Sequence, residues 1–571
     1  MPRGAGKRRS PTPRRPAGPT APRERARWSL GPAEGTVQAR LGAWAESDAV
    51  GRIWAKDPTF WPRAPASDVA DRLGWLHAPE ESAGRTSELR AFAGEVAGLG
   101  FQHVVLFGMG GSSLAAEVIA RALPGASDRP TLSVLDSTHP NAVRAALDRG
   151  TLDRTLFVVS SKSGTTLEPN AFFRTAWARV GRSAGPPGRQ FVAITDPGTP
   201  LERLARERKF RHCFSAPPDV GGRYSALTVF GLVPGALAGV DLDGLLGRAR
   251  AMATTCAEPS RARENPGLRL GAALGELARG GRDKVVLFAP GSLRSFPAWV
   301  EQLLAESLGK DGRGIVPVAN PPPPGELPRG PDAVYVRVSL RGEHDDELEA
   351  ALEAREADGA PVLRFELASP LDLGGEFFRW EFATAACGAV LEVDPFDQPD
   401  VEHAKELARR AMERPRGAAA PAEPYGVRAD DRLAAALERW AGSARPGDYV
   451  AVQAFLAPGP ETDASLDRLA SALRRSLGVV VTIGYGPRFL HSTGQLHKGG
   501  PASGLFLQLV DEPSPDLDVP ELGLTFGQIV RAQASGDRGA LEEKRRRVLV
   551  VNLGTSVAAG LDVLAREAGP A

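Results

Sequence analysis

The chain has 571 residues, of which 42% are hydrophobic and 24% charged, and its formal net charge at pH 7 is +1. This length exceeds one hydrophobic core and predicts three or four domains of about 150 residues each. The near-neutral charge gives no support to a nucleic-acid or anionic-membrane partner. The three cysteines, Cys213, Cys256 and Cys387, are too widely spaced for a disulfide framework or a metal cluster. We therefore expect a reducing, cytoplasmic compartment and no metal.

The first hundred residues carry no catalytic motif. Residues 1–27 are rich in proline, arginine and glycine and are predicted to be a disordered basic tail. A nucleic-acid-binding tail and a start codon placed too far upstream are the alternatives. Residues 28–98 bring many tryptophans and leucines, and we expect a helical preamble that packs on something larger. No apolar run approaches the roughly 18 residues of a membrane-spanning helix.

From residue 99 the sequence alternates between strands and helices. A strand at His103–Phe107 ends in the turn GMGGSS and leads into a helix at 114–123, and further strands are expected at 132–135, 156–159 and 191–195. Such alternation predicts a doubly wound parallel α/β sheet whose ligands bind at the carboxyl ends of the strands. We assign this first sheet to residues 99–270.

The segment 155–170, TLFVVSSKSGTTLEPN, carries the clearest chemical signal of that edge. An apolar strand is followed by a turn of hydroxyl residues, and a helix begins at Leu167. Hydroxyls, backbone N–H groups, the helix dipole and Lys162 all favour an anion there, and Gly164 lets the backbone approach it. The alternative is a turn that only caps the helix, because capping uses the same residue types.

The glycine-rich first turn also raises the possibility of a dinucleotide site. Gly108 and Gly110 match the first two glycines of the G-x-G-x-x-G pattern, but Ser113 stands where the third glycine belongs. We therefore favour a small phosphorylated ligand, held by both turns, over a nicotinamide cofactor.

A second α/β domain is predicted over residues 271–414, with strands at 284–289, 314–318, 333–340 and 361–367. A helix from Phe296 to Leu308 follows its first strand. Residues 415–429 are rich in proline and alanine and are interpreted as a linker. Residues 430–571 are again α/β, with strands near 448–455, 479–483, 505–509 and 548–551.

Five segments in this chain resemble the motifs of the glucose-6-phosphate isomerase family. They are FGMGGSSL at 107–114, SSKSGTTLEP at 160–169, GGRYSAL at 221–227, ESLGK at 306–310 and FDQPDVEHAK at 396–405. That family is built from two sugar-isomerase (SIS) domains, each a doubly wound parallel sheet. The resemblance thus implies an α/β protein with two SIS domains and, here, a smaller C-terminal α/β unit. The chain is similar to the isomerase half of transaldolase–isomerase fusion proteins.

The resemblance also implies site residues. By their places in the motifs, the residues expected to bind substrate are Gly111, Ser112, Ser161, Lys162, Ser163, Thr166, Gly222 and Gln398. Arg223 falls where a guanidinium would stabilise an enediolate, and Lys405 where a lysine assists ring opening. Glu306 matches the base that moves a proton between C2 and C1 of the sugar, a task that suits a carboxylate. Without the resemblance, Glu306 reads as an ordinary helix glutamate.

Ring opening needs a group that can protonate the ring oxygen near neutral pH, which suits histidine. In the family this histidine is lent by the neighbouring subunit of a dimer and lies between the ESxGK and FDQ motifs. Here that interval contains only His344, in a charged context. His491 and His497, in the segment GPRFLHSTGQLHKGGP, are the better candidates, and we favour His497 slightly for its LHKGG context. Delivery within one subunit or from a dimer partner is equally open.

The expected function is interconversion of glucose 6-phosphate and fructose 6-phosphate through a cis-enediolate, with no metal or nucleotide cofactor. The expected partners are a sugar phosphate and a second copy of the chain. Two alternatives remain open at this point: a non-catalytic SIS-type sensor of sugar phosphates, and an isomerase that also accepts mannose 6-phosphate.

Overall fold

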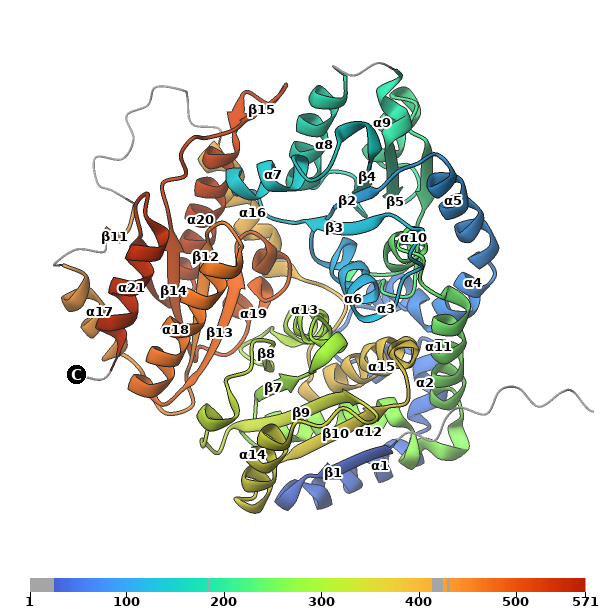
Figure 1. Cartoon of the computed structure of the whole chain (residues 1–571). Coiled ribbons are helices and arrows are strands. Elements are labelled where there is room, and N and C mark those ends of the chain that lie inside the picture. The colour runs from blue at the N-terminus through green and yellow to red at the C-terminus, as the bar shows by residue number, and fades with distance from the viewer. Residues whose placement is uncertain (1–24, 182–184, 413–424, 429–431, 570–571) are drawn as a thin grey trace, which may run out of the picture.

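Three five-stranded sheets surround the centre of the molecule (Figure 1). The structure is a computed structural model of one chain and describes residues 25–181, 185–412, 425–428 and 432–569. Among these residues, no helix is long and apolar enough to cross a membrane.

The first sheet is fully parallel and has the strand order β3-β2-β4-β5-β6. Its strands are β2 (His103–Phe107), β3 (Thr131–Leu135), β4 (Thr155–Ser160), β5 (Phe191–Thr195) and β6 (His212–Ser215). The helices that wind around it are α6 (Leu114–Ala122), α7 (Pro140–Leu147), α8 (Leu167–Val180), α9 (Pro200–Glu207), α10 (Val229–Leu237) and α11 (Leu242–Cys256). Strands β4 and β5 are buried along their whole length, as expected of apolar strands covered on both faces.

The second sheet has the order β1-β10-β9-β7-β8 and is parallel except at its β1 edge. Its strands are β1 (Arg25–Ser29), β7 (Lys284–Phe288), β8 (Val316–Val318), β9 (Ala333–Leu340) and β10 (Val362–Leu367). Its helices are α12 (Pro266–Arg279), α13 (Phe296–Leu308), α14 (Asp346–Ala357) and α15 (Leu373–Leu391), whereas the next helix, α16 (Pro399–Met412), packs on helices of the third unit.

Strand β1 corrects the predicted extent of the N-terminal tail. Residues 1–24 lie outside the described part, but Arg25, Ala26 and Arg27 belong to a strand that pairs antiparallel with β10. The ring of Trp28 packs edge-on against Phe365, 5.6 Å between centroids, which anchors the strand. The tail prediction overlooked this strand because its arginines resemble those of the preceding residues.

The preamble is mainly helical, as predicted. It consists of α1 (Glu34–Glu46), α2 (Ala49–Trp54), α3 (Ala66–Arg72), α4 (Ala78–Ala83) and α5 (Thr86–Gly98). Its aromatic residues enter the main core: Trp61, for example, is fully buried and donates a 2.7 Å hydrogen bond to the carbonyl of Ala385 on α15.

The third sheet is parallel and has the order β11-β17-β14-β12-β13. Its strands are β11 (Val427–Arg428), β12 (Tyr449–Phe455), β13 (Val480–Tyr485), β14 (Gly504–Val510) and β17 (Arg547–Asn552), and a short pair is formed by β15 (Asp518–Val519) and β16 (Leu524–Thr525). The helices are α17 (Leu433–Ala441), α18 (Pro460–Leu477), α19 (Gly494–Gly499), α20 (Phe526–Glu543) and α21 (Val557–Ala568).

The end of the predicted linker belongs to this sheet. Residues 413–424 and 429–431 lie outside the described part, but β11 pairs with β17, and the hydroxyl of Tyr425 donates a 2.6 Å hydrogen bond to Gln508. A two-residue edge strand is too short to leave a hydrophobic pattern in the sequence.

All three sheets share one winding. If the edge strands β6, β1 and β11 are set aside and the other four strands of each sheet are numbered in chain order, each sheet reads 2-1-3-4, and the edge strand lies beside the fourth. This is the winding of flavodoxin-like α/β folds, which place ligands at the carboxyl ends of the strands. The C-terminal unit is therefore a third unit with the winding of the other two.

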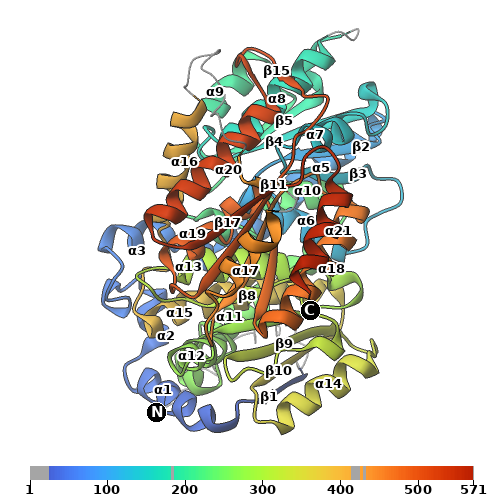
Figure 2. The same ribbon diagram turned by 90° about the vertical axis from the view of Figure 1, so that its left-hand side faces the viewer.

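The third unit shares hydrophobic cores with both of its neighbours. Phe526 of α20 stacks on Phe172 of α8 beside the first sheet, with ring centroids 6.0 Å apart. Tyr449 and Phe506 of the third sheet join the cluster that contains Val286 and Tyr335 of the second. Helix α20 also lies along α16, as Figure 2 shows.

Candidate active site

The hydroxyl-rich turn between β4 and α8 forms a compact polar loop at the carboxyl edge of the first sheet. The hydroxyls of Ser161 and Thr166 lie 2.9 Å apart, and those of Ser163 and Thr165 also lie 2.9 Å apart. Thr166 is the N-cap residue of α8, yet its side chain makes no capping hydrogen bond. The Thr166 hydroxyl therefore does not cap the helix, which speaks against the capping alternative and favours the anion-site interpretation.

Lys162 lies in the loop but already has an anionic partner. Its Nζ is 2.6 Å from Asp196 at the end of β5 and 3.2 Å from the carbonyl of Pro218. The ion pair is partly exposed, with about a fifth of each side-chain surface open to solvent. A ligand phosphate would therefore share Lys162 with Asp196.

The glycine-rich turn after β2 meets the GGR segment across the site. The turn forms a 3₁₀ helix, η4 (Gly110–Ser112), and the GGR segment forms another, η7 (Gly222–Tyr224). A Cβ on Gly111 would lie 2.0 Å from the carbonyl oxygen of Gly222, so only glycine allows this approach. The half-buried Ser112 sits beside the polar loop, since its carbonyl accepts a 2.8 Å hydrogen bond from Ser160.

Arg223 is the hub of the site. Its buried guanidinium donates to Ser307 at 2.7 Å, to Gln398 at 2.8 Å and to Glu306 at 3.3 Å. Two backbone carbonyls of the segment before Gln398 also accept from it, those of Pro395 at 2.7 Å and Asp397 at 2.9 Å. These bonds fix the planar cation in one orientation.

Lys310, the last residue of the ESLGK motif, binds the same segment from the other side. Its Nζ lies 2.6 Å from the Asp397 carboxylate and also donates to the carbonyl of Asp394. Burial lowers the pKa of Lys310 to about 8, and the neighbouring charge of Arg223 acts in the same direction. Lys310 and Arg223 together hold Gln398 in place.

Glu306 and the backbone of His491 meet at one side chain, Gln302. The Gln302 amide nitrogen lies 2.9 Å from the Glu306 carboxylate and 2.9 Å from the carbonyl oxygen of His491. Gly110 has a φ of +51°, and a Cβ there would lie 2.7 Å from that same carbonyl and 3.1 Å from the His491 Cβ. The first turn therefore closes directly over the His491 backbone.

The imidazole of His491 pairs with Glu168 in the first turn of α8. Nε2 of the ring lies 3.0 Å from the Glu168 carboxylate, and His491 keeps 15% of its side-chain surface exposed. Burial raises the pKa of Glu168, but the charge and hydrogen bond of His491, with a smaller contribution from Lys405, hold it below its usual value. Gln533 of α20 donates a further 2.7 Å hydrogen bond to the same oxygen.

His497, which the sequence analysis favoured slightly, has a different environment. Only 4% of its surface is exposed; its Nδ1 lies 3.2 Å from Gln453, and its ring contacts Phe489 and Phe506. Burial and then the charges of Lys498 and Arg546 depress its pKa well below the usual range. An enclosed ring with a lowered pKa is poorly suited to donate a proton near pH 7, whereas His491 is partly exposed beside a carboxylate. These environments favour His491 over His497 for the ring-opening role.

The other predicted lysine lies further out. Lys405 is exposed on α16 and pairs with Glu402 of the same helix at 2.8 Å. The charge of Lys405 acts on Glu168, which places Lys405 on the His491 side of the site. His344 is exposed just before α14 (Asp346–Ala357).

Several residues of the site were not among the predicted site residues. Glu168 lies within SSKSGTTLEP, Gln302 lies just before ESLGK, and Arg488 lies three residues before His491. Gln533 and Thr138 complete the set: Thr138 donates a 2.7 Å hydrogen bond to Gln533. Glu168 was recognisable only as a first-turn acid, and no local pattern marks the other four.

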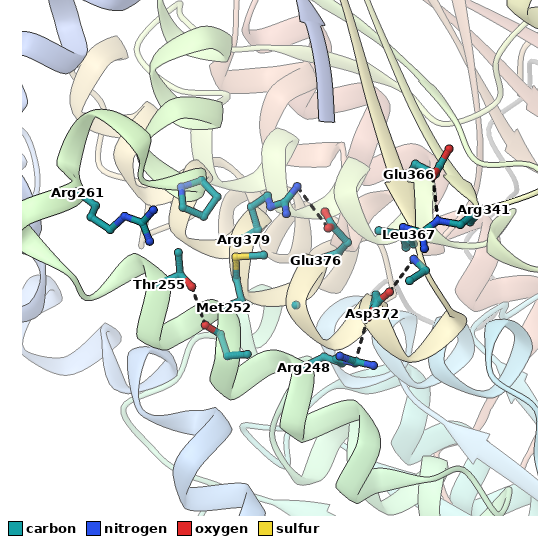
Figure 3. A pocket seen from close by; sticks show the side chains of 14 residues that line it. Arg248, Met252, Thr255, Arg261, Arg341, Glu366, Leu367, Asp372, Glu376 and Arg379 are labelled. Carbon is teal, nitrogen blue, oxygen red and sulfur yellow. Dashed lines mark hydrogen bonds and ion pairs between the residues drawn. The ribbon is translucent and has the colours of Figure 1, made fainter. Parts of the chain in front are cut away.

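A cavity of about 350 Å³ between α11, α15 and the end of β10 is separate from this group (Figure 3). It shares no residue with the set around Arg223. Three of its arginines pair with carboxylates on its own wall: Arg248 with Asp372, Arg341 with Glu366 and Arg379 with Glu376. Because these arginines already have carboxylate partners, the cavity is less suited to bind a phosphate than the hydroxyl-rich loop is.

No cluster of three or more His, Cys, Asp or Glu side chains suited to a metal ion occurs among the described residues. The chemical groups at the site are thus a carboxylate, a guanidinium, an imidazole–carboxylate pair and a hydroxyl-rich anion loop.

Solved structures place the fold among sugar-isomerase-like α/β proteins. A hypothetical protein from Thermus thermophilus superposes with a TM-score of 0.59 at 27% identity, covering 68% of this chain and 100% of that one. A glucose-6-phosphate isomerase from Chlamydia trachomatis superposes with a TM-score of 0.55 at 20% identity, covering 68% of this chain and 88% of that one, which supports the fold alone.

Sequence comparison narrows this class to one family. The phosphoglucose isomerase family model matches residues 86–315. The glucose-6-phosphate isomerase of Rubrobacter xylanophilus is 32% identical over 365 residues, which span 55% of this chain and 83% of that protein. A probable glucose-6-phosphate isomerase of Haloarcula marismortui is 32% identical over 349 residues, 54% of this chain and 77% of that one. The chain belongs to the phosphoglucose isomerase family.

Proposed function

We propose that this protein interconverts glucose 6-phosphate and fructose 6-phosphate through a cis-enediolate. The observation that carries the proposal is the meeting of Arg223, Glu306 and His491 beside the hydroxyl-rich loop, although these residues are far apart in the sequence. The names of the relatives agree with this substrate pair.

The substrate phosphate would bind at Ser161, Ser163 and Thr166, with Ser112 beside them. Hydroxyls and the free N–H groups at the start of α8 suit a dianion, and the positive end of the helix dipole adds to the attraction. Lys162 would contribute charge while it keeps Asp196 as a partner. In this role the loop positions the sugar and takes no part in bond breaking.

His491 would protonate the ring oxygen as the C1–O5 bond breaks and the C1 hydroxyl loses its proton to solvent, which yields the open-chain aldehyde. The Glu168 carboxylate orients the imidazole through Nε2. The remaining ring nitrogen, Nδ1, is then the one that faces the ring oxygen. Lys405 would assist from the same side of the site.

Glu306 would next remove the proton from C2 and return it to C1. As the proton leaves C2, negative charge develops on O1, and it passes to O2 when the O2 hydroxyl proton moves to O1. The fixed guanidinium of Arg223 stabilises this charge without reorganisation. Gln302 orients the carboxylate that carries the proton. The reverse reaction uses the same groups in the opposite order.

The test is an assay of the purified chain with glucose 6-phosphate, in which fructose 6-phosphate is detected by a coupled reaction with EDTA present. We expect turnover that EDTA leaves unchanged. A chain that binds glucose 6-phosphate without turnover would instead be a sugar-phosphate sensor. The same assay with mannose 6-phosphate decides whether the second aldose is accepted.

A further inference from the structure

The third sheet unit faces the first sheet with its own carboxyl edge. Arg488 and His491 follow β13 in the 3₁₀ helix η12 (Arg488–His491), and Asp511 follows β14. Each of the three side chains bonds to a residue of the first sheet unit. The candidate site thus lies where the carboxyl edges of two similar sheets meet.

Buried polar contacts fix this junction. Arg488 pairs with Glu117 of α6 at 2.7 Å and with Asp136 after β3 at 2.9 Å. His139, which is fully buried, lies 3.0 Å from Asp511. Because an unpaired charge here would be costly to bury, these pairs specify one docking position for the third unit.

Two shared hydrophobic cores hold the same junction. One joins α20 to α8 through Phe526 and Phe172, and the other joins the third sheet to the second through Phe506 and Tyr335. Leu496 of α19 packs so closely on Gly309 that a Cβ there would lie 2.4 Å from its Cα. A third unit that was only linked to the other two would not need such close packing against them.

We propose that the third unit completes the active site within a single chain, so that His491 acts on the substrate bound by its own chain and no second copy lends a residue. This inference rests on the proposed function and concerns the source of its ring-opening histidine. Arg488 is then a positioning residue, because it anchors η12, which presents His491, to the first sheet unit.

Co-expression of two inactive variants tests the inference. Glu306→Gln removes the base and His491→Ala removes the ring-opening group, so each chain keeps what the other lacks. If the site is built within one chain, the co-expressed pair shows no more activity with glucose 6-phosphate than the two variants made separately.

If a neighbouring copy supplied the histidine, mixed dimers would contain one intact site. Random pairing would then restore about a quarter of the parent activity, and this result would overturn the inference. His344→Ala co-expressed with Glu306→Gln is the matched control, since His344→Ala alone is expected to keep full activity at its exposed position. A His491→Ala variant that keeps parental activity would also overturn the inference. An inactive parent chain would reject the proposed function and this inference with it.

Discussion

Two neighbouring histidines show how environment separates chemistry from packing. His491 ends η12, keeps part of its ring exposed and bonds to a carboxylate of the first sheet unit. His497 lies in α19 (Gly494–Gly499), where two phenylalanines and Gln453 enclose it. Of two histidines six positions apart, one is thus partly exposed beside a carboxylate and the other is enclosed in the core, and we propose proton transfer only for the first.

The largest difference is expected between their alanine variants in catalysis. His491→Ala should lower kcat with glucose 6-phosphate by about 10²- to 10⁴-fold, the usual contribution of a positioned acid or base. Its thermal stability should fall as well, because the change leaves the buried Glu168 carboxylate without its histidine partner and with only the hydrogen bond from Gln533 among its described side-chain partners. Steady-state kinetics and a thermal melt measure the two quantities.

An open-chain substrate sharpens this prediction. Erythrose 4-phosphate cannot close a sugar ring through its phosphorylated oxygen, so its isomerisation needs no ring-opening acid. His491→Ala should therefore retain most of its activity on this substrate, whereas Glu306→Gln should lose activity on both. Equal losses for His491→Ala on the two substrates would exclude the ring-opening role.

Arg488→Gln should have an intermediate effect on catalysis. The change leaves the carboxylates of Glu117 and Asp136 without their cation and loosens η12. We expect kcat with glucose 6-phosphate to fall about 10-fold or more, since small misplacements of a catalytic group are costly. Activity on erythrose 4-phosphate should fall much less, and a structural collapse would reduce both alike.

His497→Ala should lower stability and leave the chemistry nearly intact. The truncation opens a cavity between aromatic rings and leaves the Gln453 amide without its partner, at a cost of about 2–4 kcal/mol. Urea unfolding measures this loss. At a temperature where the variant is folded, kcat with glucose 6-phosphate should stay within about 2-fold of the parent. A catalytic loss like that of His491→Ala would reverse our assignment.

The pH dependence of stability offers a smaller but independent contrast. The pKa of His497 in the folded chain lies well below its usual value of 6.5. Below pH 6.5, His497 therefore binds a proton in the unfolded chain but not in the folded chain. Stability should therefore fall with decreasing pH by at most about 1.4 kcal/mol per pH unit from this group. His497→Phe should flatten the decline of the melting temperature between pH 6.5 and 5, and an unchanged slope would contradict the assignment.

Much of the fold was readable from the sequence because long apolar strands dominate it. Residues 103–107, 191–195 and 333–340 were expected as strands and form β2, β5 and β9 with the same bounds. The strands that were not predicted include β1, β6 and β11, which are edge strands paired with a single neighbour, β10, β5 or β17. Edge pairing of this kind leaves little local pattern.

The sequence predicted only part of the candidate site, because the remainder also depends on contacts between residues that are distant in the sequence. The motifs brought Arg223, Glu306 and the hydroxyl loop into view, but the choice between His491 and His497 depends on which ring faces Glu168, more than 300 residues earlier. Both histidines lie in one glycine-rich segment with similar neighbours in the sequence. The ion pair between Lys162 and Asp196 was equally hidden, since two different strands supply it.

In the proposed reaction, Glu306 carries the proton between C2 and C1 of the sugar. The direct measurement is incorporation of solvent deuterium into the sugar phosphates, followed by NMR, during reaction in D₂O. We predict that the parent chain places deuterium at C1 of fructose 6-phosphate and at C2 of glucose 6-phosphate, and that Glu306→Gln slows this by about 10²-fold or more while substrate binding stays nearly unchanged. Exchange at the parental rate in Glu306→Gln would contradict the account.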